Sequence, residues 1–151
     1  MKQILHIRPT SLPLAPMLAK LHAESFSEEA WPIEQVRSSL RLETTQGWVA
    51  FEEAKPAGFI LCQVLSEQIE ILTFCVRPTM RRRLIGRRLL QSVIAHAREN
   101  GQKIFLEVAA DNEAARKLYD QLGFEITGTR PNYYRRGAIT IDALMFTYKR
   151  P

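Results

Sequence analysis

The stretch from Glu70 to Leu90 constrains the fold of this chain more than any other. Its first part is an apolar run with β-branched and aromatic residues, which predicts a buried strand. Pro78 has no amide hydrogen to donate to a sheet, so the strand is expected to end at Val76 or Arg77. Arginines around Gly86 follow, and then an amphipathic pattern that predicts a long helix. A strand end, a basic turn and a helix N-terminus, whose free N–H groups and dipole favour negative charge, together predict a phosphate site.

The length and composition bound the remaining possibilities. The 151 residues are expected to form one domain, 1–151, because a chain of this size can bury its own core. Charged residues follow Met1 too closely for a signal peptide, and no apolar run reaches membrane-spanning length, so a cytoplasmic location without a membrane partner is expected. The net charge of +5 favours an anionic partner, and nucleic acid, an anionic cofactor and plain solubility all remain open at this point.

The two cysteines, Cys62 and Cys75, lie in strand-like runs that are expected to pair as a hairpin around Glu67 and Gln68. A two-residue loop there sets Cys62 opposite Thr73, so buried free thiols are expected rather than a disulfide or a metal site. No metal is expected. Three histidines lack the spacing of metal ligands and are given no role: His6, His22 and His96.

Hydrophobic periodicity and turn signals predict an α+β fold on a mixed, mostly antiparallel sheet of six to seven strands with about four helices. Strands are expected at 4–8, 48–53, 57–65, 68–77, 103–109, 124–129 and 138–148. Helices are expected at 14–25, 33–42, 85–100 and 112–122. Connections are expected at 26–32, at a tight turn over 54–56 and at a polar, aromatic loop over 130–137.

The central stretch resembles a known signature. Val76-Arg77-Pro78, followed by the residues from Arg81 to Gly86, resembles the acetyl-CoA motif of the GNAT N-acetyltransferases, Gln/Arg-x-x-Gly-x-Gly/Ala, which follows a strand and opens a helix. Downstream segments resemble the second half of that motif: Leu106-Glu107-Val108, Asn112, Ala115, Leu118-Tyr119 and Leu122-Gly123-Phe124. Two further segments are similar to the RimI-type branch of the superfamily, the ribosomal-protein-alanine N-acetyltransferases: Arg130 to Tyr134 and Asp142 to Met145.

This resemblance implies a GNAT fold that transfers acetyl from acetyl-CoA, a co-substrate, directly to an amine. The acceptor it implies is a protein N-terminal α-amine, in particular the N-terminal alanine of a small-subunit ribosomal protein. Two alternatives stay open: a GNAT enzyme that acetylates a lysine or a small amine, and a non-catalytic basic module that binds RNA or the ribosome. Basic residues concentrated at two loops argue against direct nucleic-acid binding, and a monomer or weak dimer is expected.

One departure from the motif concerns Leu84, which stands where the family's first glycine is expected. Glycine at such a position allows positive φ or close approach to a pyrophosphate. If the position is left-handed, leucine costs on the order of 1–2 kcal/mol. Neighbouring arginines can offset weaker cofactor binding by attracting phosphates.

The resemblance and the helix N-terminus together indicate a cofactor site, against the plainer interpretation of a solvated basic helix start. The N–H groups from Arg81 to Gly86 are expected to hold the pyrophosphate, and those near Val76 to pin the thioester carbonyl. The family's fourth strand commonly carries a bulge that splays it from the fifth, which is expected here near Phe74 to Val76. The residues expected to bind acetyl-CoA are Phe74, Cys75, Val76, Arg81, Arg82, Arg83, Leu84, Ile85, Gly86, Arg87, Asn112 and Tyr119.

The resemblance also implies two catalytic residues. Glu107 is implied as the general base; an α-amine has a pKa near ~7.7–8.0, so a modest base suffices. Tyr119 is implied as the acid for the departing CoA thiolate, since a phenol of pKa near ~10 is still protonated where a thiol near ~8.5 has ionised. The plainer alternatives are a carboxylate paired across strands or facing solvent, a tyrosine that only packs, and an Asn112 that only caps a helix.

The acceptor side is assigned to aromatic residues in the connections. Tyr133 and Tyr134 are placed on the peptide side by the resemblance, and exposed paired tyrosines favour recognition over an ordinary hairpin tip. Phe26 and Trp31 flank two acidic residues, Glu28 and Glu29, which suit a cationic peptide or a free ammonium; a solvated turn is the alternative.

Overall fold

The computed structural model describes residues 4–81 and 84–149. Seven strands form one sheet in the order β1-β2-β3-β4-β5-β7-β6, in which β4 and β5 are parallel and the other neighbours antiparallel. The strands are β1 Leu5–Pro9, β2 Thr45–Glu52, β3 Lys55–Val64, β4 Gln68–Val76, β5 Lys103–Ala109, β6 Glu125–Arg136 and β7 Ile139–Tyr148. The α-helices are α1 Ala15–Phe26, α2 Ile33–Arg41, α3 Ile85–Asn100 and α4 Glu113–Gln121, with 3-10 turns η1 Leu12–Leu14, η2 Ser27–Glu29 and η3 Pro78–Met80. The predicted α+β class and mostly antiparallel sheet are confirmed.

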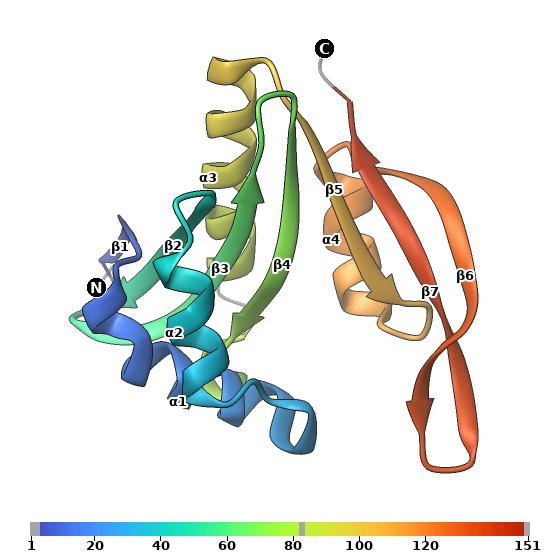
Figure 1. Ribbon diagram of the computed structural model, residues 1–151, viewed down its shortest axis with the longest axis horizontal. Coiled ribbons are helices and arrows are strands. Elements are labelled where there is room, and N and C mark those ends of the chain that lie inside the picture. Colours follow the sequence, from blue (N-terminus) through green and yellow to red (C-terminus); the bar gives the residue numbers. More distant parts are fainter. Residues whose placement is uncertain (1–3, 82–83, 150–151) are drawn as a thin grey trace.

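Helices cover both faces of the sheet (Figure 1). On one face, the apolar stripe of α3 and the inner side of α4 pack against residues such as Ile60, Ile69 and Ile104. On the other face, α1 and α2 pack against Val49 and Phe59. Of the helices in the described ranges, none is long and apolar enough to cross a membrane.

The β3–β4 hairpin departs from the predicted register. Gln68 already belongs to β4, and Cys62 lies opposite Ile71, whereas Leu61 lies opposite Thr73. The predicted loop at Glu67 and Gln68 and the Cys62–Thr73 pairing are therefore wrong, because the hairpin turns one residue earlier, where the N–H of Leu65 donates to the carbonyl of Gln68 at 2.9 Å. Leu72 is an extra residue on β4 beyond the Cys62–Ile71 pair, and it shifts the register from there on. The expected bulge exists, but it lies at Leu72 rather than between Phe74 and Val76.

This bulge decides which face each later residue of β4 covers. Ile71 packs on the α3 side, and the extra residue turns Cys75 to the α1 side and Phe74 to the α3 side. Cys62 and Cys75 consequently lie on opposite faces of the sheet. Both are buried free thiols, as predicted.

The parallel strands β4 and β5 pair over only three residues each, from Gln68–Lys103 to Glu70–Phe105. Past Glu70 the two strands separate, and Figure 1 shows them diverging toward the end of β4. The predicted splay is confirmed.

Two predicted connections are wrong. The β2–β3 turn is made by Glu53 and Ala54, both with positive φ (50° and 70°), and Pro56 already pairs in β3. The polar loop predicted over 130–137 is instead a continuation of β6, which pairs with β7 as far as Arg136. Cross-strand pairing overrides the Pro and Asn turn signals there, since Asn132 takes a positive φ of 54° within a bulge. The other helix and strand ends agree with prediction to within three residues.

Candidate functional site

The turn between β4 and α3 has the conformation that the motif predicts. Leu84 precedes α3 in the left-handed region (φ 63°, ψ 11°), and its carbonyl accepts a 3.0 Å hydrogen bond from the N–H of Arg88. Its side chain is 70% exposed, so it gains little from packing. The glycine-like conformation considered from the sequence is therefore present at a leucine. Arg82 and Arg83, two of the predicted phosphate ligands, lie outside the described residues.

The first turn of α3 lies close against β4. A Cβ on Gly86 would lie 3.3 Å from Phe74 and 3.4 Å from Val76, so the absent side chain allows the close approach. The Ile85 side chain is buried in the core, which leaves its backbone to serve a ligand. The N–H groups at this end of α3 have no partners within the helix, which suits a phosphate ligand.

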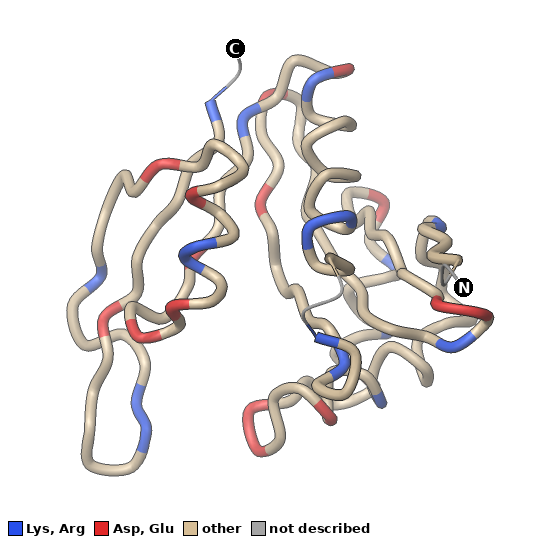
Figure 2. The backbone as a smooth tube through the Cα atoms, turned by 180° about the vertical axis from the view of Figure 1, so that it is seen from behind, with Lys and Arg blue, Asp and Glu red and all other residues tan. Residues whose placement is uncertain are grey.

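Arginines surround this helix start, as the tube in Figure 2 shows for the turn and the beginning of α3. Arg81 donates from Nε to the carbonyl of Val76 at 3.2 Å. Arg87 donates to Gln121 Oε1 of α4 at 3.4 Å, which joins the two helices on this face of the sheet.

The end of β4 offers backbone groups to the space left by β5. The N–H of Arg77 donates to the carbonyl of Ala57 in β3 at 2.7 Å. Since successive strand residues point their N–H groups to opposite sides, the N–H of Val76 faces away from β3, toward the separated β5. The Cys75 side chain lies in the α1 core, where burial chiefly raises its pKa to about 11, so only its backbone can meet a ligand on the α3 face.

Glu107 lies on the opposite face of β5 from its core-facing neighbours Leu106 and Val108. Its side chain is 27% exposed, and its Oε1 lies 3.1 Å from Nε of Arg130 in β6. The cross-strand pairing that the sequence left open is thus present. A small cavity of about 190 Å³ adjoins this pair, with Phe105 and Met145 among the lining residues.

Tyr119 of α4 is buried on the other side of the sheet from Glu107. Its ring centroid lies 5.5 Å from that of Phe146, 5.6 Å from Phe124 and 6.5 Å from Phe74. Burial is the main cause that raises the pKa of the Tyr119 phenol, and the nearby Tyr134 raises it further. The hydroxyl is therefore protonated at neutral pH. The N-terminus of the same helix is capped by Asn112, whose Oδ1 accepts from the N–H of Ala115 at 3.2 Å; capping is the plainer of the two roles considered for this residue.

The acceptor-side aromatics come from two segments that are far apart in the sequence. Tyr133 and Tyr134 pack edge to face at 5.1 Å near the end of β6. Burial is the main cause that raises the pKa of Tyr134, followed by the charges of Glu107, Tyr133 and Glu29. Tyr134 therefore lies within electrostatic range of both β5 and η2, which the sequence alone did not place together.

His22 is a structural residue that the sequence analysis missed. Trp31 donates its backbone N–H to His22 Nδ1 at 3.0 Å, so Nε2 carries the ring hydrogen and donates to Thr73 Oγ1 at 2.8 Å. The rings of Phe26 and Trp31 pack on the imidazole at 4.4 and 5.3 Å. Burial lowers the pKa of His22 to about 4. The neutral imidazole therefore links Phe26 and Trp31, the predicted acceptor aromatics, to β4. The sequence signal that could have identified this role was a histidine on the apolar face of a helix.

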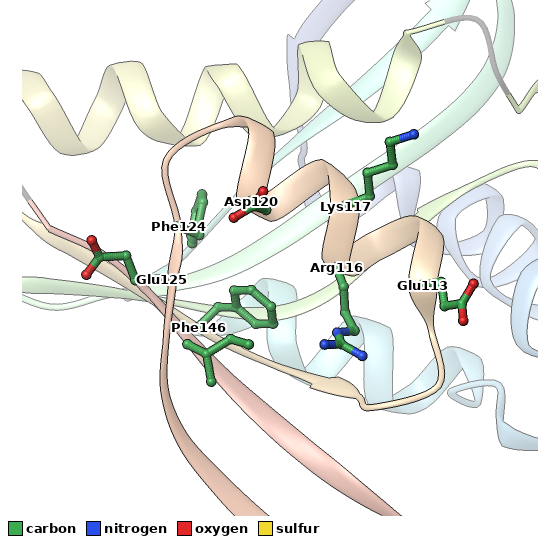
Figure 3. A pocket seen from close by; sticks show the side chains of 8 residues that line it. Glu113, Arg116, Lys117, Asp120, Phe124, Glu125 and Phe146 are labelled. Atoms are coloured by element: carbon green, nitrogen blue, oxygen red, sulfur yellow. The ribbon is translucent and has the colours of Figure 1, made fainter.

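A second pocket, of about 490 Å³, lies elsewhere (Figure 3). It lies between the outer side of α4 and strands β6 and β7, and Arg116 and Phe146 are among its lining residues. It contains none of the residues that the sequence assigned to catalysis, cofactor or acceptor. Over 4–81 and 84–149, no group of three His, Cys, Asp or Glu side chains is placed to hold a metal.

Comparison with known proteins agrees with this arrangement. The acetyltransferase (GNAT) family profile matches residues 15–124. The chain is 32% identical to the [Ribosomal protein bS18]-alanine N-acetyltransferase of Escherichia coli K12 over 136 residues, covering 89% of this chain and 88% of that protein. It is 32% identical to the Salmonella typhimurium enzyme of the same name over 147 residues, 96% and 95% of the two chains. The crystal structure of the Escherichia coli ribosomal-protein-S18-alanine N-acetyltransferase superposes with a TM-score of 0.90 at 25% identity, covering 96% and 93%. The chain therefore belongs to the acetyltransferase (GNAT) family and is an acetyl-CoA-dependent N-acetyltransferase.

Proposed function

We propose that this enzyme acetylates a protein N-terminal α-amine, the N-terminal alanine of a small-subunit ribosomal protein, with Glu107 as base and Tyr119 as acid. The observation that carries the proposal is the placement of these two residues on opposite faces of the sheet, where β4 and β5 separate. The names of the relatives that are 32% identical over most of both chains support the choice of acceptor.

The residues around the start of α3 suit acetyl-CoA. Backbone N–H groups from Ile85 to Arg87 bind the pyrophosphate, with Arg81 and Arg87 nearby for phosphate charge. The Val76 N–H, which faces the opening, binds the thioester carbonyl and stabilises its negative charge during transfer. When bound, acetyl-CoA supplies an activated acyl group next to these donors.

The remaining steps fall to side chains of this chain. Glu107 accepts a proton from the acceptor ammonium, and the neutral amine then attacks the thioester carbonyl directly. As the carbon–sulfur bond breaks, Tyr119, kept protonated by burial, donates its hydrogen to the departing thiolate, and the second proton lost by the attacking nitrogen passes through solvent to restore the phenol. Direct transfer is favoured because Cys75 is buried in the α1 core and protonated, which makes it a poor acyl carrier.

The test is acetyl transfer from acetyl-CoA to a peptide with a free N-terminal alanine and one internal lysine, read by tandem mass spectrometry. The same peptide with a blocked N-terminus is the matched control. Acetyl on the α-amine, lost in the blocked peptide, supports the proposal. Acetyl on the lysine in both peptides would move the function to a lysine or small-amine acetyltransferase.

A further inference from the structure

We propose that Arg130 is a positioning residue for acetyl transfer, which holds one oxygen of Glu107 so that the other is presented to the acceptor amine. This inference rests on the proposed function, because it takes Glu107 as the base. The observation behind it is the contact between Arg130 Nε and Glu107 Oε1 at 3.1 Å, which spans from β6 to β5 across β7.

The sheet register explains how the arginine reaches so far. Arg130 lies opposite Ala143 of β7, and Ala143 lies opposite Ala109 of β5. Side chains alternate between faces along a strand, so Ala109 shares the face of Glu107, and paired residues share a face. Glu107 itself lies opposite Met145 of β7, so Arg130 reaches the carboxylate diagonally across β7, and the small side chain of Ala143 leaves room for it.

Neighbouring contacts hold Arg130 in a fixed direction. Its guanidinium lies 5.6 Å from the centre of the Tyr133 ring. The bulge just beyond it is held by Asp142, which accepts from the N–H of Asn132 at 2.8 Å, and by Thr140, whose hydroxyl donates to Asn132 Oδ1 at 2.7 Å. The orientation of the Glu107 carboxylate is thereby linked to the strand that carries the acceptor-side tyrosines.

The pair is poorly placed to serve stability alone. The side chains of Arg130 and Glu107 are 53% and 27% exposed, and ion pairs of such exposure contribute little to folding. The contact uses Oε1, and among residues 4–81 and 84–149 no ion pair engages Oε2, which is left to accept a proton. An arginine also keeps its charge throughout the working pH range, so it can hold Oε1 without competing for the proton.

The experiment measures kcat and KM for the alanine peptide and for acetyl-CoA in purified full-length variants. Arg130→Ala is expected to lower kcat by about 10- to 100-fold, as misplacement of a catalytic group does, with little change in KM for acetyl-CoA. Arg130→Lys keeps the charge without the planar guanidinium and is expected to be intermediate. Guanidinium ion added to the buffer is expected to restore part of the activity of Arg130→Ala. The matched control is Arg136→Ala, because Arg136 lies on the same strand, is 46% exposed and is paired with Asp111 at 2.6 Å rather than with Glu107.

Glu107→Gln separates failure of this inference from failure of the proposed mechanism. If Glu107→Gln keeps near-normal kcat, the base assignment fails, and the positioning role fails with it. If Glu107→Gln is severely impaired but Arg130→Ala stays within about twofold of the wild type, the base stands and the positioning role is refuted. In the Glu107→Gln background, Arg130→Ala is expected to change kcat by less than about twofold. A full further loss there would show that Arg130 acts independently of Glu107 and would overturn the inference.

Discussion

Leu84 offers the sharpest test of how this chain departs from the motif of its family. The residue holds φ 63° at the N-terminus of α3, a conformation that costs a non-glycine residue about 1–2 kcal/mol. Glycine removes this strain but adds about 0.5–1 kcal/mol of unfolded-state entropy. The side chain is 70% exposed, so its removal loses little packing. Leu84→Gly is therefore expected to stabilise the fold by about 0.5–1 kcal/mol, which raises Tm by about 1–4 °C in a chain of this size.

Leu84→Ala is the matched control, because it removes the exposed bulk but keeps the Cβ that causes the strain. Its stability is expected to stay within about 0.5 kcal/mol of the wild type. Thermal and urea unfolding measure both variants. Equal stabilisation by glycine and alanine, or a loss of stability with glycine, would refute the strain argument.

The same pair of variants tests cofactor binding by calorimetry. If the leucine side chain limits the approach of the acetyl-CoA phosphates to the start of α3, both substitutions tighten Kd. If the backbone strain at residue 84 limits acetyl-CoA binding, only Leu84→Gly tightens Kd. An unchanged Kd in both variants would show that Leu84 does not limit acetyl-CoA binding.

Three further predictions address other parts of the molecule. Tyr119→Phe is expected to lower kcat sharply with little change in Tm, because the ring packing remains while the proton donor is lost; steady-state kinetics with wild-type turnover would refute the acid role. The folded-state pKa of His22 is lowered to about 4 from 6.5, so the unfolded state binds the extra proton between these values, and stability falls as pH drops through that window by up to roughly 3 kcal/mol. Urea unfolding between these pH values should show a shallower pH dependence in His22→Gln than in the wild type, and parallel curves would exclude His22 as the source. Gly58→Ala is expected to destabilise by about 1–3 kcal/mol, since the added Cβ would lie 2.5 Å from the Cys75 carbonyl oxygen; an unchanged Tm would show that the strands can move apart without loss.

The sequence by itself determined the parts of this protein that depend on local physics. Hydrophobic periodicity and the asparagine–glycine stop signal predict α3 with its observed ends, and the apolar run from Lys103 to Ala109 predicts β5. The motif around Gly86, taken together with the Leu106–Val108 segment and the tyrosines that follow, predicted the family. Capping of α4 by Asn112 was likewise predictable, because a cap requires only residues that are neighbours along the chain.

Tertiary structure decided the features that depend on which distant residues meet. The Leu72 bulge sets which face of β4 the later side chains cover, so that Phe74 and Cys75 join different layers of the core. The long β6–β7 hairpin replaced a predicted loop because cross-strand hydrogen bonds outweigh local turn preferences. His22 in α1 is hydrogen-bonded to Thr73 in β4, and Arg130 in β6 contacts Glu107 in β5, so both contacts join segments far apart in the sequence. Residue spacing along one strand or helix cannot specify such contacts, because they depend on the register and the layer order of the whole sheet.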